Sequence, residues 1–387
     1  MAAVGLTWRA PAAIAAVRGK AGSPSDDPRP SAASNGAAWR RGRSLDMARQ
    51  PHATLILDRA RIARLMSPAD YLAAMESAFL ALAEGRAVLP SPLHIAFAAG
   101  GFHAKGAGLT LADGRAFAAV KVNGNFPGNP ARHGLPTIQG AIVLSDAADG
   151  RVLALMDSIE VTLRRTAAAS VLAMRYLARA DADRVGVIGC GAQAAAQLEA
   201  IVDARTVRQV AVHDRDRAAA ESFAARVSAQ FGLAVAPCRN AAEVARQCDL
   251  IVTCSTATAP VLEAGDIAPG TFVAAVGADA PHKHEIAPAL MARAKVVVDS
   301  SEQCLAMGDL RHAIAAQAMR AEDVHADLAG LVAGRRPGRT SPDEIVIFDS
   351  TGLAVQDVAA AIAVYRRAAS EPDSPAFALG RDPAAPA

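Results

Sequence analysis

The chain has 387 residues, and its hydrophobic content of 52% is ample for two buried cores. Its formal net charge is only +2 and its arginines are dispersed along the chain, which argues against nucleic acid as a partner. Arg164, Arg165 and Arg175 interrupt even the Ala-rich stretch, so no apolar run reaches the roughly 18 residues of a membrane-spanning helix, and we expect a soluble protein.

Both ends of the chain are poor in hydrophobic periodicity. Residues 1–50 are rich in Ala, Arg, Ser, Pro and Gly, and we expect a disordered extension there. Two origins of this extension stay open: an Arg-bearing, acid-poor transit peptide, or a start placed upstream of a working initiator at Met47. Residues 371–387 are likewise expected to form a loose tail.

The first ordered part combines a helix with a sheet. A helix is predicted over residues 68–84, because Ser67 can cap it and Pro68 suits its first position. Short β-branched runs at 117–122, 138–144 and 152–156 lie between Gly, Pro and Asn turns, which predicts an antiparallel sheet. A long helix is predicted to follow over residues 159–179.

Strands then alternate with helices. The predicted strands cover residues 185–188, 209–213, 250–254, 271–276 and 296–299, and the intervening helices include 192–202 and 217–231. This alternation indicates a parallel, doubly wound sheet. The last predicted elements, a mostly helical stretch at 313–333, a strand at 344–349 and a helix at 357–369, do not continue the alternation. We therefore predict that residues 181–309 are inserted into a discontinuous α+β domain of residues 51–180 and 310–370.

A glycine turn follows the first strand of the alternating region. Gly189-Cys-Gly191-Ala-Gln-Ala194 matches the dinucleotide pattern G-x-G-x-x-G/A, in which the pyrophosphate sits at the helix N-terminus. The next strand ends at Asp214, 25 residues after Gly189, where a carboxylate can accept hydrogen bonds from ribose hydroxyls. The pattern predicts a Rossmann-type site for NAD; NADP stays possible because Arg215 is adjacent.

Three further positions are candidates for substrate chemistry. Lys121, one of only five lysines, lies in a predicted strand and can face a substrate carboxylate or simply solvent. Arg164 and Arg165 project about 100° apart on a helix, so at most one of them can clamp an anion. Asp279 and Lys283 lie in a loop after a parallel strand, where Asp279 can transfer protons or cap a helix.

Metal binding is not predicted. His282 and His284 share a loop without a third ligand nearby, and the five cysteines form no CxxC pair, which argues against a zinc site or a disulfide framework. The cysteine usage favours a reducing cytoplasm.

Five segments, in this order, resemble the ornithine cyclodeaminase and mu-crystallin family: Gly134-Leu-Pro-Thr137, Met156-Asp157, Leu163-Arg-Arg-Thr-Ala-Ala-Ala-Ser170, Gly189-Cys-Gly-Ala-Gln193 and Val276-Gly-Ala-Asp-Ala-Pro281. The resemblance covers about residues 55–365. It implies an NAD-binding Rossmann domain inserted into a domain for substrate binding and dimerisation, and hence a homodimer.

The resemblance also implies roles for individual residues. Lys121 and Arg165 correspond to substrate-binding residues, Asp279 to the proton donor of cyclodeaminases, and Thr351 to a late substrate-binding position. The implied cofactor-contacting positions are Thr137, Arg165, Gly189, Gly191, Ala192, Gln193, Asp214, Ser255, Val276, Lys283 and Ser350. One departure concerns a further substrate-binding arginine of the family, which Pro92 replaces here, and it leaves the substrate open.

The implied activity is the conversion of L-ornithine to L-proline and ammonia, in which NAD⁺ takes a hydride from the α-carbon and later returns it. One alternative is reduction of a cyclic imine such as Δ1-pyrroline-2-carboxylate by NAD(P)H, and another is alanine-dehydrogenase-type chemistry. A non-catalytic protein that binds NAD(P)H or a small ligand, as in the crystallins, is an alternative of another class.

Overall fold

The computed structural model describes residues 53–371 and 373–379, so the predicted extension at 1–50 lies outside the described residues. The first elements are β1 (Thr54–Leu57), α1 (Arg59–Leu65) and α2 (Pro68–Ala83). Helix α2 begins where the sequence predicts, because Ser67 and Asp70 form a reciprocal capping box and Pro68 occupies the first turn.

The first sheet is largely antiparallel, as predicted. Its strands run in the order β18-β1-β7-β6-β5-β4-β2, β3 pairs with β4, and β1 with β7 is the parallel pair. The remaining strands are β2 (Ala87–Val88), β3 (Leu93–Phe97), β4 (Gly100–Thr110), β5 (Ala116–Asn125), β6 (Ile138–Asp146), β7 (Val152–Asp157) and β18 (Ala376–Phe377), with the short helix α3 (Asn129–His133) between β5 and β6.

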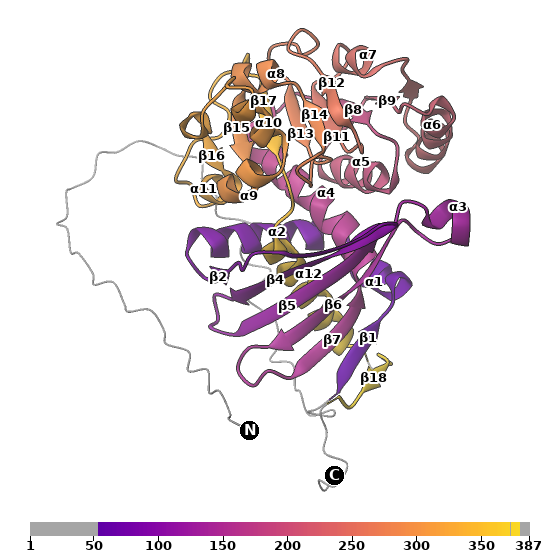
Figure 1. The fold of residues 1–387 in the computed structure, drawn as a ribbon, viewed down its shortest axis with the longest axis vertical. Helices are drawn as coiled ribbons and strands as arrows, with labels where there is room; N and C mark the ends of the chain where they lie inside the picture. Colours follow the sequence, from indigo (N-terminus) through magenta and orange to yellow (C-terminus); the bar gives the residue numbers. More distant parts are fainter. Residues whose placement is uncertain (1–52, 372, 380–387) are drawn as a thin grey trace, which may run out of the picture. The chain divides into compact units, whose positions relative to one another are not determined.

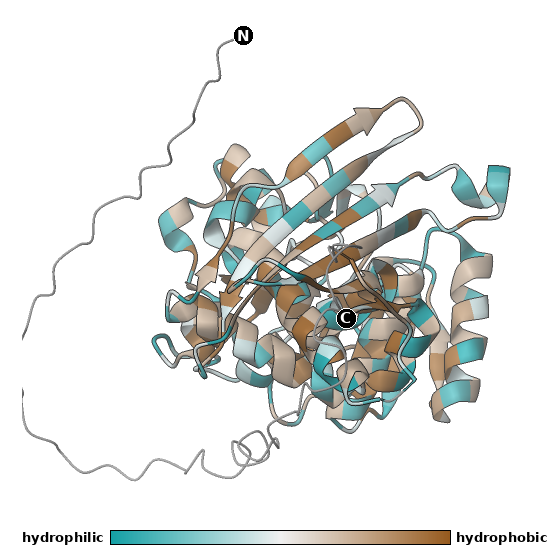
Figure 2. Cartoon of the chain, turned by 90° about the horizontal axis from the view of Figure 1, so that it is seen from below, coloured by the Kyte–Doolittle hydropathy of each residue, from teal (hydrophilic) through white to brown (hydrophobic). Residues whose placement is uncertain are grey.

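One face of the first sheet is covered by helices. Helix α12 (Ala354–Ala369) packs on β4, β5 and β6, and it contacts α2 and α4 (Ser158–Leu177) (Figure 1). Residues of β5 alternate accordingly, with Phe117, Ala119 and Lys121 buried and Val120 and Val122 exposed. Figure 2, coloured by hydropathy, shows that both hydrophobic and hydrophilic residues occur along the strands of this sheet. Lys121 therefore faces the helices.

The second sheet has eight parallel strands in the order β10-β9-β8-β11-β13-β17-β15-β16. They are β8 (Arg184–Ile188), β9 (Gln209–His213), β10 (Val235–Pro237), β11 (Leu250–Thr253), β13 (Phe272–Ala275), β15 (Lys295–Val298), β16 (Ala326–Asp327) and β17 (Val346–Asp349). The fold class predicted from the sequence is confirmed: the chain is α/β with a doubly wound parallel sheet.

Short helices and a small sheet complete this part of the chain. The helices are α5 (Ala192–Ala204), α6 (Arg217–Phe231), α7 (Ala241–Ala245), α8 (Pro288–Arg293), α9 (Ser301–Ala306), α10 (Asp309–Ala315) and α11 (Leu328–Val332). Strands β12 (Thr258–Leu262) and β14 (His284–Ile286) pair in parallel.

Three predictions for the C-terminal part are wrong. Residues 344–349 do not return to the first sheet: β17 lies between β13 and β15, because its four buried residues need a position covered on both faces. Residues 313–333, predicted to be mostly helical, are helical only in part, because Gln317 adopts a left-handed φ of 55° after α10 and only a short 3-10 helix, Ala321–Asp323, precedes α11. The tail is not loose at Ala376–Phe377, which pair with the edge strand β1. The division into two domains stays a prediction.

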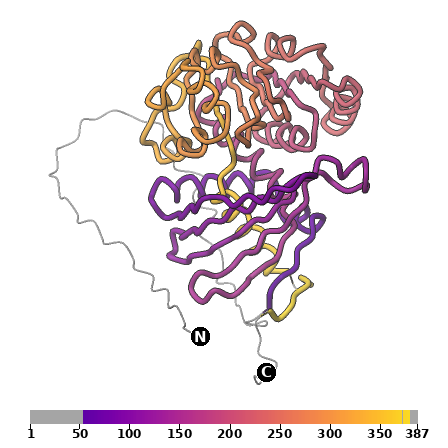
Figure 3. The backbone as a smooth tube through the Cα atoms, viewed as in Figure 1, coloured from indigo at the N-terminus to yellow at the C-terminus, as the bar shows by residue number. Residues whose placement is uncertain are grey.

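The C-terminal helix nevertheless returns to the first sheet. Figure 3 follows the chain from β17 through residues 350–353 into α12, which lies against the first sheet. The loop after β17 therefore connects the carboxyl edge of the second sheet to the buried face of the first.

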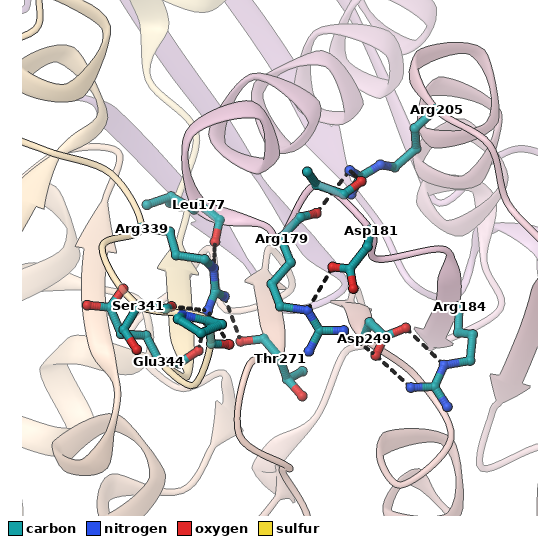
Figure 4. A network of polar contacts seen from close by, with 12 residues as sticks. Leu177, Arg179, Asp181, Arg184, Arg205, Asp249, Thr271, Arg339, Ser341 and Glu344 are labelled. Carbon is teal, nitrogen blue, oxygen red and sulfur yellow. Dashed lines mark hydrogen bonds and ion pairs between the residues drawn. The ribbon is translucent and has the colours of Figure 1, made fainter.

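Arginine side chains link several segments at the other edge of the second sheet, where its parallel strands begin. Arg179 and Arg184 both bind the carboxylate of Asp249, and Arg339 donates to the carbonyls of Leu177 and Glu344 (Figure 4). These contacts join segments that precede strands, so they account for several dispersed arginines structurally. Among the described residues, no helix combines the length and the apolar character needed to cross a membrane.

Candidate active site

The glycine turn lies at the carboxyl end of β8. Gly189 has a φ of +93°, and a Cβ atom on it would lie 2.9 Å from the backbone of Cys254, so both its conformation and its surroundings require glycine. A Cβ atom on Gly191, the N-cap of α5, would meet no atom within 4 Å. Ala194 is fully buried against the sheet. The turn thus leaves open space beside the positive end of a helix.

Asp214 lies directly beside this turn. Its carboxylate accepts hydrogen bonds from the backbone N–H of Cys190 at 2.8 Å and of Asp216 at 2.9 Å. The end of β9 is thereby joined to the turn after β8. A dinucleotide fits these residues, with its phosphates at the start of α5 and a ribose beside Asp214.

A buried glutamate, Glu285, links the loop after β11 to the loop after β13. Glu285 accepts hydrogen bonds from Ser255 N–H and Oγ at 2.7 Å each, from Gly277 N–H at 2.8 Å and from Thr253 Oγ1 at 2.8 Å. Burial raises the pKa of Glu285, although these donors oppose that shift. The predicted positions Ser255 and Val276 lie in or next to the loops that Glu285 holds.

Two predicted substrate-binding cations meet on one carboxylate. Lys121 Nζ lies 2.7 Å from Asp357 Oδ2, and Arg165 Nε lies 3.0 Å from Asp357 Oδ1. Arg165 also donates to Gln356 Oε1 at 2.5 Å, and Lys121 donates to Thr162 Oγ1 at 3.3 Å. The three charged groups come from β5, α4 and α12, and all are at least 94% buried, with Lys121 and Arg165 each 6% exposed and Asp357 2% exposed.

The pKa values of this triad reflect burial and mutual charge. Burial lowers the pKa of Lys121 to about 8, with Asp357 opposing the shift and Arg165 adding to it. Burial alone would raise the pKa of Asp357, but Arg165 and Lys121 outweigh it and the pKa is lowered. Asp357 therefore stays ionised between the two cations.

The loop after β17, residues 350–353, lies against the triad of Lys121, Arg165 and Asp357. Asp299 accepts hydrogen bonds from the backbone N–H groups of Thr351 and Gly352 and from the hydroxyl of Ser350. Gly352 has a φ of +79°, and a Cβ atom there would lie 2.8 Å from Arg165 Nη1. Lys105 Nζ donates to the carbonyl of Gly352 at 3.0 Å and lies 3.4 Å from that of Thr351.

Asp279 and Lys283 form an ion pair of 2.5 Å in the loop after β13. The side chain of Asp279 is 55% exposed, and its charge raises the pKa values of both Lys105 and His103 against larger lowering effects of burial. The charge of Asp279 is therefore close enough to Lys105 and His103 to act on both.

Other predicted residues have different partners. Gln193 donates from its side chain to the carbonyl of Leu163, which fastens α5 to α4. Arg164 points away from Asp357 and pairs with Glu160 and Glu199. Thr137 lies in the connection between β5 and β6, where its carbonyl accepts from Phe126.

Two residues that the sequence singled out without a site role, Pro92 and His284, lie apart from the triad. Pro92 is exposed before β3. His284 stacks on His312 at 4.0 Å.

Sequence reasoning missed Lys105, Glu285, Asp299 and Asp357. Glu285 and Asp357 could have been noticed in the sequence, because each is an acid among hydrophobic neighbours. Glu285 lies in the strand β14 and Asp357 in the apolar helix α12. At the start of a helix, however, an acid is equally explained by the helix dipole. Lys105 lay in a strand that the sequence analysis did not predict.

The sequence profile of the ornithine cyclodeaminase/mu-crystallin family matches residues 52–372. The chain belongs to this family. Alanine dehydrogenase of Archaeoglobus fulgidus is 38% identical over 318 residues, which are 82% of this chain and 96% of that protein. The resemblance inferred from the sequence is confirmed.

Solved structures of the family have the same fold. An archaeal alanine dehydrogenase dimer with bound NAD superposes with a TM-score of 0.79 at 36% identity, covering 84% of this chain and 99% of that one. The Thermococcus litoralis Δ1-pyrroline-2-carboxylate reductase in complex with NADH and L-proline gives a TM-score of 0.77 at 33% identity, covering 81% and 97%. The prediction of an NAD-dependent enzyme is confirmed, because relatives of this chain include dehydrogenases, reductases and a lysine cyclodeaminase.

Proposed function

We propose that this protein is an NAD(H)-dependent enzyme that interconverts an α-amino acid and the corresponding α-imino acid. One observation carries the proposal: Gly352, at the carboxyl edge of the second sheet, lies against Arg165 of the buried triad. Ligands of doubly wound sheets bind at this edge, so a cofactor there is next to the cations from the first sheet.

The second sheet would hold NAD. The open space at Gly191 and the N-terminus of α5 would receive the pyrophosphate, and Asp214 would bind a ribose and disfavour a 2′-phosphate. Bound NAD(H) supplies a hydride acceptor or donor. Glu285 would keep the loops of Ser255 and Val276 in the shape that borders the nicotinamide.

The first sheet would hold the substrate. Arg165 and Lys121 would bind its α-carboxylate, since a guanidinium fork and an ammonium both match a carboxylate. Fixing the carboxylate orients the α-carbon toward the cofactor, which is catalysis by positioning. Asp279 would hold or deliver the proton at the substrate nitrogen, and Thr351 would border the substrate.

Ornithine cyclodeamination is the second candidate, because Asp279 and Lys283 are both present in the loop that carries this chemistry in the family resemblance. The charges of the site weigh against it. Asp357 is already shared by two cations, and a substrate with a side-chain ammonium would add another positive charge.

One assay separates the candidates. The full chain would receive ornithine with catalytic NAD⁺, pyrroline-2-carboxylate with NADH or NADPH, and 2-oxo acids with ammonia and NADH. Net loss of NADH absorbance supports reduction of an imine. Ammonia release from ornithine without net NADH change supports the cyclodeaminase, and Asp279→Ala should then abolish it while NAD still binds. Cofactor binding without turnover in any arm would leave only the non-catalytic alternative.

We further propose that the protein is a homodimer. Large hydrophobic side chains are exposed on the face of the first sheet that the helices do not cover: Leu93, Ile95, Phe97, Phe102, Val120, Val122 and Leu155. Exposed apolar patches of this kind mark interfaces, and the archaeal alanine dehydrogenase is a dimer. The free thiols of all five cysteines fit the reducing cytoplasm proposed as the location.

A further inference from the structure

Lys105 and Lys121 lie opposite each other on neighbouring strands. They form a register pair between β4 and β5, next to the pair of Ala107 and Ala119 on the same helix-covered face. Two like charges placed directly opposite in an antiparallel pair destabilise a sheet. An anion beside the pair offsets this repulsion, and Asp357, 2.7 Å from Lys121, supplies one on that side.

Among the described residues, Lys105 differs from Lys121 and Arg165 in having no carboxylate within ion-pair distance. Within residues 53–371 and 373–379, Lys121 and Arg165 share Asp357, whereas the polar contacts of the Lys105 ammonium are the carbonyls of Gly352 and Thr351. Burial lowers the pKa of Lys105, and Arg165 lowers it further. Its side chain remains partly exposed, so a ligand can reach it.

The charges around Lys105 leave a positive excess. The charges with the largest effect on it are those of Arg165, Asp279, Asp357 and Asp299, and Lys121 is its cross-strand partner. Asp279 pairs with Lys283, which leaves three cations facing the two carboxylates of Asp357 and Asp299. Among these groups, the cations outnumber the carboxylates by one.

This excess distinguishes between substrate classes. A protonated imine with a single carboxylate has no net charge and leaves the excess in place. A second carboxylate makes the substrate anionic and balances it, while a side-chain ammonium increases it. In a buried site such an imbalance is costly, because water screens the charges poorly.

We propose that Lys105 binds a second anionic group of the substrate, so that the protein acts on α-imino and α-amino dicarboxylic acids in preference to those with apolar or cationic side chains. This proposal rests on the proposed function, since it concerns the substrate of the same site. Lys121 and Arg165 would bind the α-carboxylate and Lys105 the carboxylate of the side chain.

The test compares substrates on the full chain. NADH oxidation is followed with ammonia and oxaloacetate or 2-oxoglutarate as dicarboxylic precursors, and with pyruvate as the monocarboxylic one. We expect the dicarboxylic precursors to have the higher kcat/KM. Lys105→Met should lower the ratio of kcat/KM for the dicarboxylic precursors to kcat/KM for pyruvate by about 30-fold or more, as expected for removal of one partner of a buried charge pair.

Two controls keep the outcomes distinct. Lys295→Met removes a lysine that binds Thr340 and Glu344 away from the site, and it should leave the substrate preference unchanged. On the wild-type protein, succinate should inhibit competitively at concentrations at which propionate does not, which tests the site even if Lys105→Met fails to fold.

The proposal is overturned if pyruvate is the better substrate, if ornithine is turned over fastest, or if succinate and propionate inhibit alike. The proposed function survives the first of these results. If no 2-oxo acid or imine oxidises NADH at all, both the proposed function and the substrate class fail.

Discussion

The carboxylate of Asp357 lies between Lys121 and Arg165, 2.7 Å from the ammonium and 3.0 Å from the guanidinium Nε. These groups are 236 and 192 residues from Asp357 in the chain, and they meet because β5, α4 and α12 share one buried face. The arrangement holds two cations in place before any substrate arrives, so little of their freedom is lost on binding.

Asp357→Asn should destabilise the protein strongly. The substitution keeps the size of the side chain but leaves two buried cations without their counter-charge, which costs about 3–5 kcal/mol in free energy of unfolding. Urea denaturation followed by circular dichroism would measure it. Asp113→Asn, in an exposed ion pair with Arg115, is the control and should change the stability by less than about 1 kcal/mol. Equal effects of the two variants would contradict a structural role for the triad.

The pH dependence of substrate binding should follow Lys121. Its pKa is about 8, lowered from the ordinary 10.5, and only the charged form binds a carboxylate. Activity should therefore be retained below pH 8, and kcat/KM should fall above it by up to about tenfold per pH unit. Lys121→Arg stays charged throughout, so the decline should move to higher pH. A profile that is the same in both proteins would show that another group controls binding.

Asp214 should set the preference for NADH over NADPH. Its carboxylate lies at the glycine turn, 2.8 Å from the N–H of Cys190, and would repel a 2′-phosphate. Asp214→Asn keeps an acceptor for that N–H but removes the charge, and the ratio of kcat/KM for NADH to that for NADPH should fall by about tenfold or more. Asp216→Asn, at the N-cap of α6, serves as the matched control. An unchanged ratio in the Asp214 variant would remove the basis for NAD selectivity.

Glu285 should be needed for cofactor affinity although it is fully buried. Its carboxylate holds Ser255 and Gly277, so Glu285→Gln removes a charged acceptor from two loops at once. We expect the Kd of NADH, measured by fluorescence titration, to rise by about tenfold or more. Substrate analogues that bind the first sheet should be affected much less. Weakened NADH binding without this difference would indicate general unfolding instead.

Charges introduced on the exposed face of the first sheet should dissociate the proposed dimer. Val120 and Val122 are 47% and 43% exposed on the same side of β5, and lysines there would repel each other across an isologous interface. Sedimentation should give a dimer for the wild type and a monomer for the Val120→Lys, Val122→Lys double variant. Leu305→Lys, an exposed leucine on α9, should remain dimeric. A monomeric wild-type protein would refute the proposal.

Most of the second sheet could be predicted from the sequence because its signals are local. The strand at Val185, the glycine turn, α5 and the strand ending before Asp214 follow one another within about thirty residues, and each has its own pattern. The membership of β17 could not be predicted, because the strand and helix that precede it, β16 and α11, are only two and five residues long and have no clear pattern in the sequence.

The candidate substrate site could likewise be predicted only in part. Lysine scarcity, the helix that carries Arg165 and the family resemblance point to Lys121 and Arg165 from the sequence alone. Asp357 is their common partner because α12 returns to the first sheet. Lys105 lies opposite Lys121 because of the register of β4 against β5. Charge pairing acts over a few ångströms regardless of separation along the chain, so only the tertiary structure decides which charges meet.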